Sequence, residues 1–267
     1  MGETGICNAR RNHAGVLVSM NYGKVTSLHL DPIEKKPLVH FFPGSRILSA
    51  GSFGCNLRCH WCQNAGISQA RAHHFSELPL TAPEQLAGSV RKRGSIGLAY
   101  TYNEPVIWFE YMLETAALIH DMGKKNVMVT NGYINPGPLK RLLTLIDAFN
   151  VDLKAFNDDV YRFHTGGRLE AVKNTLKTIA LSGKHLEITF LVVPRVNDSL
   201  EDFEAMVHWI RSELGREQVL HISRYFPAWH YEQAPTSLEL MEKMLKIASG
   251  QLDHVYPGNA PYIFKDS

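Results

Sequence analysis

The chain has 267 residues, of which 45% are hydrophobic and 20% are charged, and its formal net charge is +2. These values fit one globular domain of α/β barrel size and give no evident nucleic-acid partner. No stretch reaches the ~20 consecutive apolar residues of a membrane span, and the N-terminus lacks the apolar core of a secretory signal. We therefore expect a cytoplasmic protein with no membrane partner.

An N-terminal extension, residues 1–44, is predicted to form a β-hairpin ahead of the main domain, residues 45–267. Two short apolar runs, at 16–18 and 25–28, flank the segment 21–24. That segment reads Asn-Tyr-Gly-Lys, a composition typical of a tight turn between two antiparallel strands. The runs are therefore expected to pair with each other.

From residue 45 onward, short apolar runs alternate with helical patterns, which indicates βαβ units and a parallel sheet. The predicted strands are 46–53, 96–102, 126–131, 149–154, 186–193 and 219–224. The predicted helices are 81–93, 104–122, 137–147, 168–182, 199–214 and 236–249. Such repeats suit either an open, doubly wound sheet or an incomplete barrel, and the pattern alone does not separate the two.

Three of the four cysteines, Cys55, Cys59 and Cys62, follow the first of these strands at C-x3-C-x2-C spacing. Bunched cysteines point to metal rather than to disulfides. Three thiolates can each ligate a different iron of a 4Fe-4S cubane and leave the fourth iron open for a chelating cofactor. The alternative is a structural zinc site, for which His60 would supply the fourth ligand from a cramped position. Cys7, alone upstream, is expected to be a buried thiol.

The pattern C-x3-C-x-aromatic-C, with Trp61 as the aromatic residue, resembles the signature of the radical S-adenosylmethionine (SAM) superfamily. Nearly the whole chain is similar to the AmmeMemoRadiSam system radical SAM enzymes, relatives of the pyruvate formate-lyase activating enzymes. The segments that carry this resemblance are 5–10, 31–38, 42–45, 101–105, 130–133, 152–154 and 256–259. The resemblance implies an α/β fold, a partial (β/α)6 TIM-like barrel with the cluster and SAM at its C-terminal mouth.

The resemblance also implies an activity. The enzyme would reductively cleave SAM at a 4Fe-4S cluster to a 5'-deoxyadenosyl radical, which abstracts hydrogen from an unidentified protein or small-molecule substrate. A one-electron donor such as flavodoxin or ferredoxin would supply the electron, and this step requires no side chain as a general acid or base. Two alternatives stay open: an activase of a glycyl radical enzyme, and an iron-sulfur electron-transfer module without SAM chemistry.

By the same resemblance, groups at the strand ends would hold SAM. The implied cofactor-binding residues are Trp61, Gln63, Asn64, Asn103, Glu104, Thr130, Asn131, Asp152, Lys154 and Val193. Glu104, with Asn103, is assigned to the methionine ammonium group. Lys154 is assigned to the carboxylate or the ribose, and Val193 to the wall of the adenine pocket.

Each assignment has a purely structural alternative. Asn103 would cap a helix, with Glu104 near its positive end. The Asn-Gly pair after Thr130 would form a plain turn. Asp152 and Lys154, which share one face of a strand, would form a buried ion pair, and the expected adenine wall would be ordinary core packing.

The last predicted strand and the segment after it hold candidate substrate contacts. These are His221, Arg224, Tyr225 and Trp229. The scattered histidines His73, His74 and His185 are expected on the solvated surface instead.

Overall fold

The computed structural model describes residues 3–260, and the chain divides into two compact units. The first unit comprises Met1–Arg58, Asn64–Thr130 and Ile134–Asn150, and the second comprises Cys59–Gln63, Asn131–Tyr133 and Val151–Ser267. The segment with the three bunched cysteines therefore contributes residues to both units. The division into an extension, 1–44, and a core, 45–267, stays a prediction, and the tail 261–267 lies outside the described residues.

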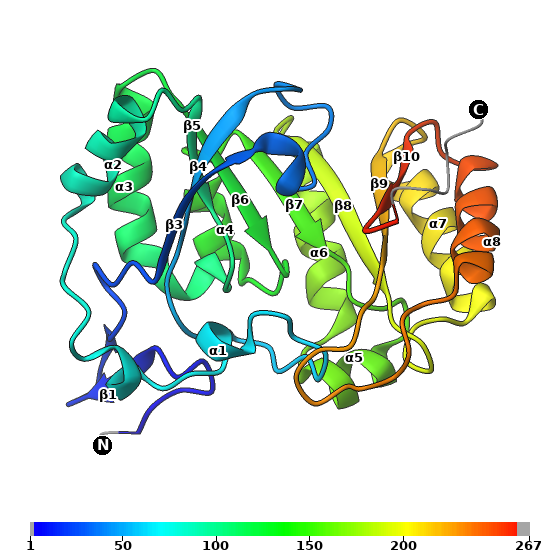
Figure 1. Ribbon diagram of the computed structural model, residues 1–267, viewed down its shortest axis with the longest axis horizontal. Helices are drawn as coiled ribbons and strands as arrows, with labels where there is room; N and C mark the ends of the chain where they lie inside the picture. Colours follow the sequence, from blue (N-terminus) through cyan, green and yellow to red (C-terminus); the bar gives the residue numbers. More distant parts are fainter. Residues whose placement is uncertain (1–2, 261–267) are drawn as a thin grey trace. The chain divides into compact units, whose positions relative to one another are not determined.

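Figure 1 shows the elements of the described residues in chain order. The strands are β1 (Arg10–His13), β2 (Val16–Ser19), β3 (Ser27–Pro32), β4 (Arg46–Gly51), β5 (Gly97–Tyr100), β6 (Lys125–Thr130), β7 (Ala148–Asp152), β8 (His185–Val192), β9 (Val219–Arg224) and β10 (Val255–Gly258). The α-helices are α1 (Ala65–Ser68), α2 (Pro83–Lys92), α3 (Phe109–Asp121), α4 (Pro136–Leu142), α5 (Asp158–Thr165), α6 (Leu169–Leu181), α7 (Leu200–Leu214) and α8 (Leu238–Ser249). The 3-10 helices are η1 (Ile33–Lys35), η2 (Ala72–Phe75) and η3 (Pro105–Trp108).

In the first unit, β4, β5 and β6 form a parallel sheet, and β3 pairs with β4 in the antiparallel direction. Helices α2 and α3 contact each other and β5 beside these strands (Figure 1). Ile47, Ala99 and Val127, from three adjacent strands, form one fully buried cluster. Ile33 and Leu38, from the segment after β3, complete this cluster. That segment is therefore anchored in the core by its own apolar side chains.

In the second unit, β8, β9 and β10 are parallel neighbours, and helices α5 to α8 belong to the same unit. The fold is α/β with a mostly parallel sheet, as predicted, and it is consistent with a partial barrel. Every predicted strand after residue 45 is present with its ends within two residues of the prediction. None of the helices between residues 3 and 260 has both the length and the apolar character needed to cross a bilayer.

The predicted N-terminal hairpin is wrong in its pairing. Strand β2 pairs with β1, upstream of it, in the antiparallel direction. The turn between them is Ala14-Gly15, and both residues have positive φ, 51° and 87°, which is the requirement of a type I′ turn. Strand β3 pairs with β4 instead, so the segment 21–24 joins two different sheets rather than closing a hairpin.

Candidate functional site

The cysteine loop leaves β4 through Gly54, whose φ is 89°. A Cβ atom at this position would lie 2.3 Å from the carbonyl oxygen of Cys7 and 2.9 Å from the Cβ of Ala9, so only glycine fits this close approach. Cys7 itself is buried, as predicted. The N-terminal segment thus packs directly against the residue before Cys55.

The chemistry of the donor set fits an iron-sulfur cluster. Cys55, Cys59 and Cys62 are reduced thiols, and each is partly buried. Within the second unit, the backbone N–H of Cys62 donates to the carbonyl of Cys59 at 3.2 Å, which tightens the C-x2-C turn. Burial raises the pKa of the Cys59 thiol to about 11, and the positive charge of Lys154 opposes this rise. A cation beside a thiol favours its thiolate form, the form that ligates metal.

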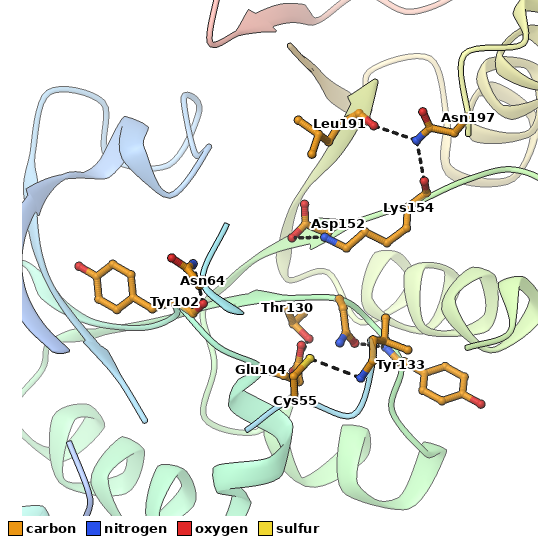
Figure 2. A network of polar contacts seen from close by, with 12 residues as sticks. Cys55, Asn64, Tyr102, Glu104, Thr130, Tyr133, Asp152, Lys154, Leu191 and Asn197 are labelled. Atoms are coloured by element: carbon orange, nitrogen blue, oxygen red, sulfur yellow. Dashed lines mark hydrogen bonds and ion pairs between the residues drawn. The ribbon is translucent and has the colours of Figure 1, made fainter. Parts of the chain in front are cut away.

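Residues 3–260 bring no three His, Cys, Asp or Glu side chains into the arrangement that holds a single metal ion. The assignment of the cluster to Cys55, Cys59 and Cys62 therefore stays a prediction. Two of the other three predicted residues of the loop, Gln63 and Asn64, are exposed. Asn64 donates from Nδ2 to the backbone carbonyl of Tyr102 at 2.7 Å (Figure 2). The loop is thus tied to the end of β5.

Asn103 joins two strand ends of the first unit. Its Oδ1 accepts from the N–H of Ser52 at 2.9 Å, and its Nδ2 donates to the carbonyl of Gly54 at 3.0 Å. The alternative that Asn103 caps the following helix is therefore wrong, since its side chain is used to hold the start of the cysteine loop. This contact places the residue next to the loop and does not test its role in binding a cofactor.

Glu104 is the residue that caps the following helix. Its Oε1 accepts from the N–H of Val106 at 3.0 Å, at the start of η3, and from Oγ1 of Thr130 at 2.7 Å (Figure 2). Glu104 is only 3% exposed. The structure therefore brings together two predicted residues, Glu104 and Thr130, in one buried hydrogen-bonded pair at the ends of β5 and β6.

The turn after Thr130 has the geometry of the structural alternative. Oδ1 of Asn131 accepts from the N–H of Tyr133 at 2.9 Å, and Gly132 has a φ of 70°. A Cβ atom on Gly132 would meet Cγ1 of Val151 at 2.8 Å, so the turn requires glycine on two grounds. This turn accounts for Asn131 without a cofactor and does not test its role in binding one.

Asp152 and Lys154 lie on one face, as the strand alternation predicted, and form an ion pair of 3.0 Å (Figure 2). Burial acts to lower the pKa of Lys154. The negative charges of Asp152 and of a Cys59 thiolate act in the opposite direction and outweigh it, so the pKa of Lys154 is raised overall. The predicted ion pair is thus present in the second unit, but it is only partly buried, since 16% of the Lys154 side chain and 30% of the Asp152 side chain are exposed.

Asn197 is a residue whose role the sequence analysis missed. Its Nδ2 donates to the carbonyls of Lys154 at 2.7 Å and Leu191 at 2.8 Å, and its Oδ1 accepts from the N–H of Val193 at 2.6 Å (Figure 2). One buried amide therefore fixes the ends of two strands. The sequence showed an asparagine five residues beyond the end of β8, but it could not show that this side chain bonds Lys154, which is distant in the chain.

Trp61 and Val193 pack together in one cluster of the second unit, with Val196 and Tyr225. Trp61 is 3% exposed and Val193 is fully buried. Core packing, the structural alternative, therefore accounts for Val193. The same contact means that the aromatic residue between two cysteines is fixed by the end of β8.

The candidate substrate contacts do not form one cluster at the end of β9. His221 lies within the strand, and its Nε2 contacts Oε2 of the fully buried Glu187 at 2.6 Å. His185 contacts Oε1 of the same carboxylate at 2.8 Å, and 26% of its side chain is exposed, so it is partly buried where the sequence predicted a solvated surface position. Arg224 donates from Nε to the carbonyl of Thr236 at 2.7 Å, Tyr225 is buried, and Trp229 is 37% exposed.

Comparisons with known proteins agree with these features. The sequence profile of the radical SAM superfamily matches residues 51–210. An uncharacterized protein of Methanocaldococcus jannaschii is 41% identical over 97% of this chain and 78% of its own length. The pyruvate formate-lyase-activating enzyme of Clostridium pasteurianum is 26% identical over 62% of this chain and 70% of its own length. Among solved structures, Streptococcus suis SuiB bound to S-adenosylmethionine has a TM-score of 0.63 at 11% identity, over 79% of this chain and 50% of that one.

Proposed function

The chain belongs to the radical SAM superfamily, and from this premise we propose that it reductively cleaves SAM at a 4Fe-4S cluster held by Cys55, Cys59 and Cys62. Membership of the superfamily implies both cofactors. A 4Fe-4S cluster held by these thiols would supply the one-electron chemistry of reductive SAM cleavage, with the electron coming from an external donor. The observation that carries the proposal is the set of three partly buried thiols on one eight-residue segment.

The residues of the first unit would bind the methionine end of SAM. Glu104 is buried, and the donors on its Oε1, the hydroxyl of Thr130 and the amide of Val106, are both neutral. A carboxylate pairs well with an ammonium cation, and the methionine end of SAM carries one. Asn103 and Asn64 would fix the position of this carboxylate, because each ties the cysteine loop to the turn that carries it.

The residues of the second unit have their own proposed contacts with SAM. Lys154 is charged and would attract the carboxylate or a ribose hydroxyl of SAM, while Asp152 and Asn197 fix its orientation. Trp61 and Val193 would exclude water on the adenine side. Gln63 and Asn131 complete the proposed set as polar neighbours of the cysteine loop and of the turn after β6.

The proposal also covers the electron donor and the location of the protein in the cell. Superfamily enzymes need an electron donor, and a flavodoxin or ferredoxin in the cytoplasm would supply the electron here. A glycyl radical activase is the second candidate function, and the similarity to the activating enzyme of Clostridium pasteurianum favours it. A module that only transfers electrons is the third, and it differs from both because it forms no 5'-deoxyadenosine.

The test is an assay for 5'-deoxyadenosine. The chain is reconstituted with iron and sulfide without oxygen, then incubated with dithionite and SAM. We expect 5'-deoxyadenosine to accumulate only when cluster, reductant and SAM are all present. If a chain whose absorption spectrum shows an intact cluster forms none, the proposal is wrong and the electron-transfer module is favoured.

A further inference from the structure

The segment 31–38, which begins with the last two residues of β3, has no role in the proposed reaction, yet it buries a charge. Ile33 and Leu38 are fully buried in the core cluster of the first unit, and they draw the residues between them inward. Lys36 is consequently only 3% exposed. Lysine is rarely buried to this extent because its ammonium group loses hydration, so the surroundings of Lys36 need an explanation.

The ammonium group of Lys36 has few partners in the structure. Nζ donates to Oδ2 of Asp31 at 2.9 Å and lies 4.8 Å from the centre of the Tyr102 ring. Within residues 3–260 its side chain makes no other hydrogen bond or ion pair. An ammonium group has three N–H donors, so this one has capacity for a further acceptor.

Positive charge is in excess around Asp31. Its Oδ2 also accepts from the hydroxyl of Tyr102 at 2.9 Å, and its Oδ1 lies 3.9 Å from the ammonium of Lys35. Partial burial acts to raise the pKa of Asp31, but the hydrogen bonds from Lys36 and Tyr102 lower it overall. Two ammonium groups thus face one ionised carboxylate, and the cluster has a net positive charge that suits an anion.

Tyr102 connects this cluster to the candidate cofactor residues. It directly precedes Asn103 and Glu104, and it has a φ of 74°, which is strained for a residue other than glycine. Its backbone carbonyl accepts from Asn64, while its ring is directed away from the Glu104 and Thr130 pair (Figure 2). The strained turn therefore presents a carboxylate on one side and the Lys36 cluster on the other.

The cluster is open to solvent on one side. The ring of His29, on β3, meets the ring of Tyr102 edge to face at 6.1 Å, and His29 is exposed. The carboxylate of Asp31 is itself 17% exposed. A ligand that reaches Lys36 would have to pass these two side chains on the side of β3, because Lys36 itself is only 3% exposed.

We propose that Lys36, supported by Asp31 and Tyr102, binds an oxyanion of a small-molecule substrate, a carboxylate or a phosphate. The inference rests on the proposed function, since it places the substrate beside the turn that would hold SAM. Asp31 keeps the ammonium oriented, and Lys35 is a bystander with a side chain that is 68% exposed.

The experiment is isothermal titration calorimetry of the reconstituted full chain with two probes, inorganic phosphate and acetate. We expect at least one probe to bind with one-to-one stoichiometry. Binding of phosphate alone indicates a phosphorylated substrate, and binding of acetate indicates a carboxylate. Lys36→Met should weaken that binding about tenfold or more, since a charge-assisted hydrogen bond is lost. Lys35→Met, the matched control, should change it less than about twofold.

Asp31→Asn separates a binding role from a merely structural ion pair. Asp31→Asn keeps an oxygen atom that can orient the Lys36 ammonium, so this variant should still bind the oxyanion, although it weakens the fold. If Lys36→Met does not fold, the double variant Asp31→Asn and Lys36→Met removes the unpaired charge and should also fail to bind. The inference is overturned if neither probe binds the wild-type chain, or if both lysine variants weaken binding equally. Calorimetry needs no SAM cleavage, so an oxyanion that binds in a chain forming no 5'-deoxyadenosine would overturn only the proposed function.

Discussion

Two acidic residues at strand ends have opposite surroundings. In the first unit, neutral donors hold the buried carboxylate of Glu104. In the second unit, Asp152 forms an ion pair of 3.0 Å with Lys154. The hydrogen bonds to Oε1 of Glu104 come from uncharged groups, whereas the charge of Asp152 is balanced by that of its partner. Glu104 should therefore matter more for SAM binding, and the Asp152 and Lys154 pair more for stability.

The largest effect on SAM cleavage should come from the cysteine loop, because Glu104 and the Asp152 and Lys154 pair can act on SAM only when the cluster is present. Cys59→Ala should prevent assembly of the cluster and lower formation of 5'-deoxyadenosine at least about 100-fold, because a metal ligand is lost. The far-ultraviolet circular dichroism should change little, since the loop lies outside the regular elements. Cys7→Ala is the matched control and should retain the iron content. Equal loss of iron in both variants would contradict the assignment.

The second largest effect should be on KM for SAM, and it tests the role of Glu104. Glu104→Gln keeps the size of the side chain and removes its charge, so KM for SAM should rise about 10- to 100-fold, the cost of losing one charge-assisted hydrogen bond. The thermal midpoint should fall only slightly, since an amide oxygen can still accept from Thr130. Glu110→Gln, on α3 and paired with Arg10, is the control and should leave KM unchanged. An unchanged KM in Glu104→Gln would remove the contrast between the two groups.

The smallest effect should follow substitution of the ion pair. Lys154→Met leaves Asp152 partly buried without its cation and should lower the free energy of unfolding by about 1–3 kcal/mol, with KM for SAM rising less than in Glu104→Gln. Urea denaturation measures the first quantity and the 5'-deoxyadenosine assay the second. Lys177→Met, which removes an exposed pair with Glu213, should cost less than about 0.5 kcal/mol. A larger rise in KM than in Glu104→Gln would reverse the comparison.

The sequence predicted the repeating part of the fold well, because apolar runs report locally on buried strands. Strand β9, residues 219–224, was predicted with its observed ends. Helix α5 was missed, although Asn157 caps its start and Gly166, with a φ of 74°, follows its end. Eight residues are too few for a clear periodic pattern, so only the capping residues at its two ends could have predicted this helix.

Those parts of the candidate site that lie close together in the chain could be predicted from the sequence. Contacts between residues on different strands could not. The three cysteines and the shared face of Asp152 and Lys154 follow from spacing alone. The contact of His185 with Glu187 also follows strand alternation, but only the pairing of β8 with β9 adds His221 to that carboxylate. The pairing of β3 with β4 likewise depends on the tertiary fold, and so the burial of Lys36 could not be read from its sequence neighbours.

The central claim is that three thiolates leave one iron of a cubane open to SAM. Electron paramagnetic resonance of the reduced, reconstituted chain tests it most directly, with spectra recorded before and after addition of SAM. We predict the signal of a 4Fe-4S cluster whose g-values change when SAM binds. An unchanged signal, or a chain that holds one zinc ion in place of iron, would contradict the account.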